Sequence, residues 1–154
     1  MKTNTSKPTI WNYFRATIRF WAARAARHYG LISRSRRKFE DAVDAYGQAI
    51  RLNPAMARAY LERGILRWRE LGQPEQALSD LDATLQLRPD WPETLFWRAM
   101  AHHAHGDYPA AIADLSAYLA SGDLTWKDEA AKQLNLMQAM TPDRDAPRSA
   151  LMAG

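Results

Sequence analysis

Three histidines, His102, His103 and His105, form the most conspicuous group of side chains that could do chemistry. His102 and His105 would share one face of a helix, and Asp107 follows them. A zinc site usually needs three or four ligands with partners that orient them, and nothing else nearby supplies one. We therefore interpret the group as polar side chains beside a turn, and we predict no metal site.

No other pattern in the sequence is typical of a catalytic centre. The chain contains no glycine-rich phosphate loop, no nucleophile elbow and no H-E-x-x-H motif. It also contains no cysteine, which excludes disulfides and thiolate metal sites. The carboxylates are spread over predicted helix faces instead of being paired. These observations predict a protein that is not an enzyme and needs no cofactor.

The first quarter of the chain is strongly basic. Residues 1–39 contain ten Lys and Arg and no Asp or Glu, whereas the remainder contains eleven Lys and Arg and seventeen Asp and Glu. Such a block suits an acidic partner, the phosphates of nucleic acid or an anionic membrane. The predicted basic patch consists of Arg15, Arg19, Arg24, Arg34, Arg36, Arg37 and Lys38.

Helices must position these residues, because the sequence repeats a helical pattern. Residues 39–54, 74–89 and 108–123 align without gaps, which places Ala42, Ala77 and Ala111 at equivalent positions 35 and 34 residues apart. Each stretch follows another apolar-periodic stretch, and glycine and proline separate the two at 71–74 and 106–109. The first unit has basic residues 36–38 at its turn instead. The pattern predicts an all-α fold of paired helices.

A period of 34 residues with this pattern resembles the tetratricopeptide repeat. The resemblance covers residues 23–125 and implies an α-solenoid of three helix pairs, at about 23–56, 57–91 and 92–125. One departure is Tyr118, which stands in the third unit where the family has a small residue. A helical extension would precede the array, and a capping helix would follow it.

Two recurring patterns predict contacts between the helices. Gly30, Gly64 and Ala99 are equivalent small residues in mid-helix, which indicates close approach of a neighbouring helix. Two of the units also place an arginine before the small residue and an aspartate in the following helix. The pairs are Arg63 with Asp80 and Arg98 with Asp114, and we interpret them as ion pairs within a unit, the alternative being separate solvated charges.

The resemblance also implies a binding groove, because ligands of this family usually lie in the concave surface lined by the first helix of each unit. The expected groove residues are Arg27, Leu31, Arg34, Arg58, Leu61, Ile65, Trp68, Phe96, Met100 and His103. This mixture of cations and large apolar groups suits a peptide with apolar anchors and some acid, with Trp and Arg as hot spots. The alternative is that several of these residues, Leu61 and Ile65 above all, serve ordinary packing.

One subfamily holds the carboxylate ends of heat-shock chaperones with Lys, Asn and Arg. The matching places here hold Arg27, Leu31, Glu62, Glu93 and Trp97. Only the arginine fits, and two places carry the opposite charge. The resemblance therefore predicts that the chain does not bind chaperone tails in that manner.

The two ends lie outside the repeats. Residues 1–22 form a basic aromatic arm in which Trp11, Phe14, Ile18 and Trp21 would share one helix face. That face could cap the first repeat, bind a partner or a second copy, or lie on a membrane, and the arm could instead be a targeting segment. Residues 124–140 suit a closing segment whose capping helix spans 126–140, with Leu124, Ala131, Leu134 and Met137 turned towards the array, and 141–154 suit a flexible tail.

Together these features predict a scaffold or adaptor that binds a protein or peptide through its groove, its N-terminal helix or both. The alternative is an assembly factor that uses the basic segment to associate with a membrane surface or with nucleic acid, of which nucleic acid is less favoured. We expect a cytoplasmic protein, the alternative being one that is peripheral to a membrane through the arm. The fold leaves the partner and the pathway open.

Overall fold

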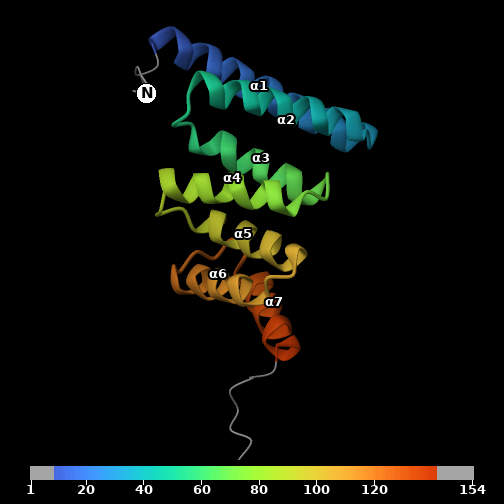
Figure 1. Ribbon diagram of the computed structural model, residues 1–154, viewed down its shortest axis with the longest axis vertical. Coiled ribbons are helices and arrows are strands. Elements are labelled where there is room, and N and C mark those ends of the chain that lie inside the picture. The colour runs from blue at the N-terminus through green and yellow to red at the C-terminus, as the bar shows by residue number, and fades with distance from the viewer. Residues whose placement is uncertain (1–8, 142–154) are drawn as a thin grey trace, which may run out of the picture.

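The computed structural model describes residues 9–141, which form helices joined by turns (Figure 1). The described helices are α1 (Ile10–Ser33), α2 (Arg36–Leu52), α3 (Ala57–Arg69), α4 (Pro74–Leu87), α5 (Pro92–His105), α6 (Tyr108–Ala120) and α7 (Lys127–Met140). They pack in sequential pairs and stack in chain order from α1 at one end to α7 at the other. The predicted all-α solenoid is confirmed.

Small residues allow the two helices of a pair to approach closely, as predicted. A Cβ atom added to Gly30 would lie 2.7 Å from the ring of Phe39 on α2. A Cβ atom at Gly64 would lie 3.0 Å from the Cγ atom of Leu81 on α4. Both distances are shorter than ordinary van der Waals contact, so a side chain at either position would force its neighbour on the paired helix to move.

The predicted ion pairs between paired helices are also confirmed. Arg63 donates two hydrogen bonds to Asp80, at 2.9 and 2.6 Å, and Arg98 donates two to Asp114, at 2.7 and 2.6 Å. A third arginine, Arg67, donates to Asp80 at 2.8 Å. Both aspartates are buried, so these fork-shaped contacts satisfy carboxylates that could not otherwise leave water.

The turns follow the local sequence. Gly72 and Gly106 have positive φ angles of 65° and 89°, which a residue with a side chain adopts at a cost. In the first unit Arg34 takes the left-handed conformation, with φ at 50°, and ends α1. Residues 36–38, expected at the turn, instead begin α2, so that expectation was wrong by about one turn of helix.

Helix α1 is much longer than its counterparts. It has 24 residues, whereas α3 has 13 and α5 has 14. The helix therefore runs without a break through residue 22, where we expected the arm to meet the first repeat. Its buried residues, Ala16, Ala23 and Gly30, are small and seven residues apart, and α2 packs along this side.

At the other end, α7 packs on α6 and buries Met137, as predicted. Leu124 does not join it, since its side chain lies in the preceding turn and is 74% exposed. The tail predicted for 141–154 lies outside the described residues from 142 onwards, as do residues 1–8 of the arm.

Candidate functional site: an aromatic pocket on the first-helix face

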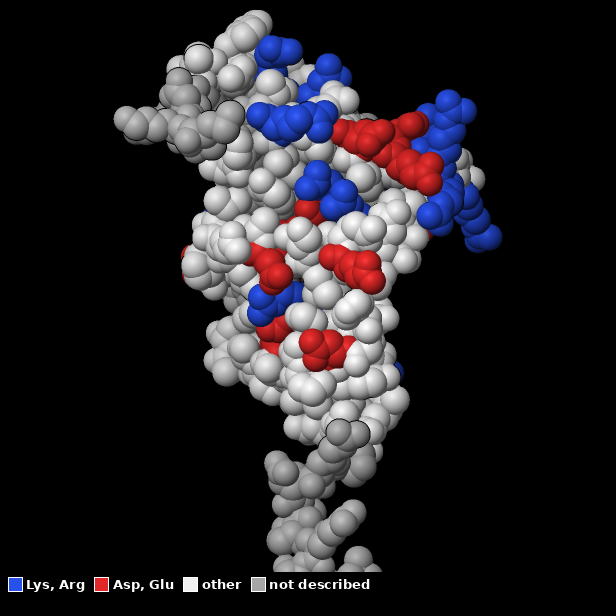
Figure 2. Space-filling model, viewed as in Figure 1, with Lys and Arg blue, Asp and Glu red and all other residues white. Residues whose placement is uncertain are grey.

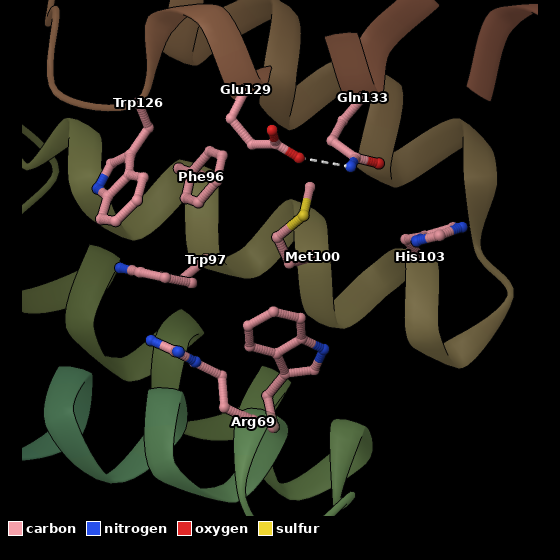
Figure 3. A pocket seen from close by; sticks show the side chains of 9 residues that line it. Arg69, Phe96, Trp97, Met100, His103, Trp126, Glu129 and Gln133 are labelled. Carbon is pink, nitrogen blue, oxygen red and sulfur yellow. Dashed lines mark hydrogen bonds between the residues drawn. The ribbon is translucent and has the colours of Figure 1, made fainter. Parts of the chain in front are cut away.

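A cavity of about 400 Å³ opens between the first helices of successive repeats (Figure 3). Its size falls within the range usual for ligand sites. We call it the aromatic pocket. It is lined by Trp68 and Arg69 from α3, by Phe96, Trp97, Met100 and His103 from α5, and by Trp126, which directly precedes α7, with Glu129 and Gln133 from α7 itself.

Aromatic rings form a continuous wall in this pocket. The rings of Phe96 and Trp126 are stacked with centroids 5.3 Å apart, and Trp97 meets Trp126 edge-on at 5.2 Å. Trp68 lies 5.6 Å from Trp97 across the gap between α3 and α5. Such contacts hold large side chains in fixed positions, so the cavity exists before any ligand arrives.

Tyr118 positions one part of this wall. Its side chain is fully buried beside Phe96, and its hydroxyl donates a hydrogen bond to Asp123 at 2.7 Å. The same hydroxyl accepts a hydrogen bond from the backbone N–H of Trp126, also at 2.7 Å. Burial raises the pKa of Tyr118, and the hydrogen bond from Tyr118 lowers the pKa of Asp123. The large residue that departs from the family pattern thus fixes the start of α7.

The rim of the pocket is polar. Gln133 donates a hydrogen bond to Glu129 at 2.7 Å, and the guanidinium of Arg69 lies 5.6 Å from the ring of Trp97 (Figure 3). Both Arg69 and Glu129 are exposed at the mouth. The site can therefore enclose an apolar side chain while its rim offers one cation and one anion to the polar atoms around that side chain.

The first helices of the repeats, α1, α3 and α5, form one face of the stack. On the half of this face away from the aromatic pocket, charged side chains of opposite sign pair with one another. Glu62, which is buried, accepts hydrogen bonds from Arg27 of α1 at 3.1 Å and from Arg58 at 3.0 Å. Arg58 also lies 3.6 Å from Glu93 of α5. This ion-pair ladder joins α1, α3 and α5, so its cations are already occupied by carboxylates of the chain itself.

The ten expected groove residues divide into four groups. Four line the aromatic pocket, namely Trp68, Phe96, Met100 and His103. Leu61 and Ile65 are buried in the hydrophobic core, as the packing alternative held. The ion-pair ladder contains Arg27 and Arg58, whereas Leu31 and Arg34 are exposed at the end of α1.

Sequence reasoning missed five residues of the pocket: Arg69, Trp97, Trp126, Glu129 and Gln133. Three of them belong to the segment predicted as a cap. A capping helix that continues the stack stands where the first helix of a fourth repeat would stand. Its inner face therefore belongs to the groove. That reasoning, together with the tryptophan just before residue 127, could have identified the segment as part of the site.

The N-terminal face lies far from this pocket. Trp11, Phe14, Ile18 and Trp21 are exposed on α1 and do not pack on the first repeat. Of the basic patch, Arg15 and Arg19 border the end of α2, whereas Arg34, Arg36, Arg37 and Lys38 surround the α1–α2 turn. Arg36 and Lys38 form ion pairs with Glu40 and Asp41. Figure 2 shows the basic side chains gathered towards the α1–α2 end of the stack.

The histidine cluster does not form a multidentate site. Within residues 9–141 no group of three His, Cys, Asp or Glu side chains is placed to hold a metal ion. The Nδ1 atom of His102 lies 3.8 Å from Asp107, and His105 lies 3.9 Å from Glu75 on another helix. His103 instead packs beside Tyr108 and contributes to the aromatic pocket.

A search of the described helices for a membrane-spanning segment finds none, because no helix combines the necessary length with sufficient hydropathy.

Known proteins share this sequence pattern. Family models described as "TPR repeat" and "Tetratricopeptide repeat" match residues 30–70 and 69–125. The tetratricopeptide repeat and J domain-containing co-chaperone of Cryptococcus neoformans is 30% identical over 115 residues, which are 75% of this chain and 21% of that protein. Hsc70-interacting protein 1 of Drosophila melanogaster is 32% identical over 93 residues, 60% of this chain and 23% of the relative. The chain thus spans about a fifth of these relatives.

Solved structures share the fold. The first repeat domain of Spaghetti (RPAP3), bound to an HSP90 peptide, superimposes with a TM-score of 0.73 at 17% identity, over 83% of this chain and 94% of that one. The chaperone SycD of Yersinia enterocolitica, in complex with a YopD peptide, gives 0.70 at 17% identity, over 80% and 92%. The sequence period, the stacked helix pairs and the two family models agree, and the chain belongs to the tetratricopeptide repeat family.

Proposed function

We propose that this protein is a non-catalytic adaptor that binds a peptide segment of a partner protein in the aromatic pocket. The observation that carries the proposal is the cavity itself, a preformed aromatic wall on the face where α3, α5 and α7 lie side by side. A large apolar side chain of the peptide would fill the cavity. Its backbone and neighbouring residues would contact the rim.

The rim chemistry narrows the class of peptide. Arg69 suits an acidic residue beside the apolar anchor, and the carboxylate and amide of Glu129 and Gln133 suit backbone N–H and C=O groups. A helical or extended peptide with one large apolar anchor and a nearby Asp or Glu meets these requirements.

The ion-pair ladder argues against recognition of a terminal carboxylate at the other half of the face. A peptide carboxylate placed there would have to displace Glu62 from Arg27 and Arg58 and leave a buried carboxylate without a partner. Removing one side of a buried ion pair costs about 3–5 kcal/mol, which a single new ion pair does not recover. The similar structures that hold peptides support peptide binding in general. In this chain we propose that the peptide binds through an apolar side chain in the aromatic pocket, and not through a terminal carboxylate at the ladder.

The test is a selection of peptides from a random library on the full-length chain, followed by affinity measurements on two tryptophan variants. Trp68→Ala removes one wall of the pocket, and Trp91→Ala removes another half-buried tryptophan outside it. We expect Trp68→Ala to weaken binding by about 30-fold or more, as for a hot-spot residue.

The matched variant should bind within about threefold of the unaltered chain, since it leaves the cavity intact. Circular dichroism of both variants checks that each keeps its helices. Selected peptides that bind both variants equally well would contradict the proposal. A selection enriched only in peptides without a large apolar residue would also contradict it.

A further inference from the structure

The outer side of α1 carries large apolar side chains that no other described element covers. Trp11, Phe14, Ile18 and Trp21 are between 51% and 63% exposed and recur at three- and four-residue spacing. At 3.6 residues per turn they lie opposite Ala16, Ala23 and Gly30, the side on which α2 packs. We call these four residues the apolar stripe. Figure 1 shows α1 as the end of the stack, so nothing described overhangs the stripe.

Positive charge borders this stripe on both sides. Helix α1 contains four arginines and no acidic residue. By helical position Arg15 and Arg19 lie beyond one edge of the stripe and Arg24 beyond the other. The guanidinium of Arg24 lies 5.1 Å from the ring of Trp21, so charge and apolar surface are in direct contact. Whatever covers the stripe must therefore be both apolar and negative.

A hollow beside the stripe offers a place for an anion. It has a volume of about 220 Å³ and is lined by Arg15 and Arg19 of α1 and by Gln48, Arg51 and Leu52 of α2. Among the ion pairs between described residues, none involves any of its three arginines. Guanidinium groups bind phosphate oxygens through paired hydrogen bonds. We call this feature the arginine hollow.

A second copy of the chain does not satisfy these requirements. Two α1 helices placed stripe to stripe would bring their arginines together without a single carboxylate on either helix to pair with them. Like charges facing one another across an interface oppose association. Nucleic acid would satisfy the arginines but would leave Ile18 and the other apolar side chains of the stripe in water.

We propose that the outer face of α1 docks onto an anionic lipid membrane. The apolar stripe would lie in the boundary between headgroups and acyl chains, where tryptophan is favoured, and the arginine hollow would bind headgroup phosphates. The helix would lie parallel to the surface. Helices α5 and α7, which contribute most of the lining of the aromatic pocket, lie towards the other end of the stack (Figure 1), so the pocket would stay open to a peptide.

The test is co-sedimentation of the full-length chain with vesicles of phosphatidylcholine, alone or with 30% phosphatidylserine. We expect binding to the anionic vesicles to be at least about tenfold tighter and to weaken with salt. Trp11→Glu combined with Trp21→Glu should lower that affinity by about 100-fold, because carboxylates would replace interfacial rings. Changing all three arginines of the hollow to Gln should lower it by a similar factor, at about fivefold per charge.

Matched controls separate this surface from the rest of the molecule. Leu124 and Leu136 are 74% and 49% exposed near the other end, so changing both to Glu tests whether any exposed apolar pair matters. That variant and Trp68→Ala should sediment like the unaltered chain. The two stripe tryptophans are exposed, so their replacement should leave the helical circular dichroism unchanged.

Several outcomes would overturn the proposal. Equal binding to neutral and anionic vesicles would show that the arginines do not contribute to binding. Unchanged binding by the stripe variant, Trp11→Glu with Trp21→Glu, would show that the tryptophans do not contribute. A lipid-free dimer in light scattering that the stripe variant abolishes, with no vesicle binding, would assign the face to a second copy. Oligonucleotide binding that survives in the stripe variant, again without vesicle binding, would assign the basic residues to nucleic acid.

Discussion

Two ion pairs, Arg63–Asp80 and Arg98–Asp114, join the paired helices of a repeat. In the first, replacing the aspartate should cost more stability than replacing the arginine, and in the second the reverse should hold. Asp80, whose side chain is 3% exposed, accepts hydrogen bonds from both Arg63 and Arg67. Replacing Asp80 with Ala would leave two largely buried guanidinium groups together without a counterion. We expect a loss of about 3–5 kcal/mol in the free energy of unfolding. Replacing Arg63 with Ala leaves Asp80 paired with Arg67, so the loss should be nearer 1.5–3 kcal/mol, roughly that of charged hydrogen bonds.

In the third repeat it is the arginine, and not the aspartate, that has two partners. Arg98 donates to Asp114 and also to Asp82, at 2.8 Å, whereas Arg98 is the one arginine paired with Asp114 among the described residues. The hydrogen bond to Asp114 makes the largest contribution to the raised pKa of Arg98. Here the arginine variant should lose about 3–5 kcal/mol, and Asp114→Ala should lose less, because Arg98 keeps a partner.

Urea unfolding followed by circular dichroism and by tryptophan fluorescence would measure all four variants. Coincidence of the two signals checks that the transition is two-state, which a short array needs for these energies to be comparable. Asp80→Asn and Arg98→Lys serve as milder variants where an alanine variant is too unstable to measure. If replacing the aspartate costs more stability in both repeats, or replacing the arginine does so in both, the second partners do not determine these losses.

Three further predictions concern single residues. Gly30→Ala should destabilise the protein by about 1–3 kcal/mol in urea unfolding through its clash with α2, whereas Gly47→Ala, where the nearest atom would be 3.4 Å away, should cost nothing or stabilise it by up to about 1 kcal/mol. Tyr46→Phe should be neutral or stabilise by about 1 kcal/mol, because the buried hydroxyl of Tyr46 has no partner among the described residues. Burial raises the pKa of Tyr46 above its ordinary value of 10.0. Titration of Tyr46 therefore leaves the free energy of unfolding unchanged below pH 10. As the pH rises further, this free energy falls, because only the unfolded chain releases the proton, and the Phe variant should lack this part of the alkaline destabilisation. Tyr118→Phe should weaken peptide binding in a titration while keeping the helices, because Trp126 loses the hydrogen bond that fixes it.

Most of the fold could be predicted from the sequence, because the same contacts between paired helices recur in each repeat and require the same types of residue at equivalent positions. Gly30 and Gly64 are small since a neighbouring helix lies against them, and Arg63 and Arg98 recur since each pairs with a buried aspartate. Spacing along the chain reports such contacts directly. The length of α1 was harder to predict, because its apolar stripe is periodic whether or not another helix covers it.

The candidate site was only partly predictable. Trp68 and Phe96 lie on repeat positions that the family uses for binding, so the resemblance identified them. Trp126 lies outside the repeats and joins the site through the turn that Tyr118 holds, a contact that no periodicity encodes. The neutralisation of Arg27 by Glu62 depends on two helices meeting at hydrogen-bond distance, which sequence spacing alone does not establish.

The indole N–H signals of the six tryptophans, observed by nitrogen-15 NMR during titration with a selected peptide, test the peptide-binding claim most directly. Each tryptophan gives one signal, and single substitutions assign them. We expect the signals of the three pocket tryptophans, at positions 68, 97 and 126, to shift with the affinity of the complex, and those of Trp11, Trp21 and Trp91 to stay in place. Shifts confined to the second group would contradict it.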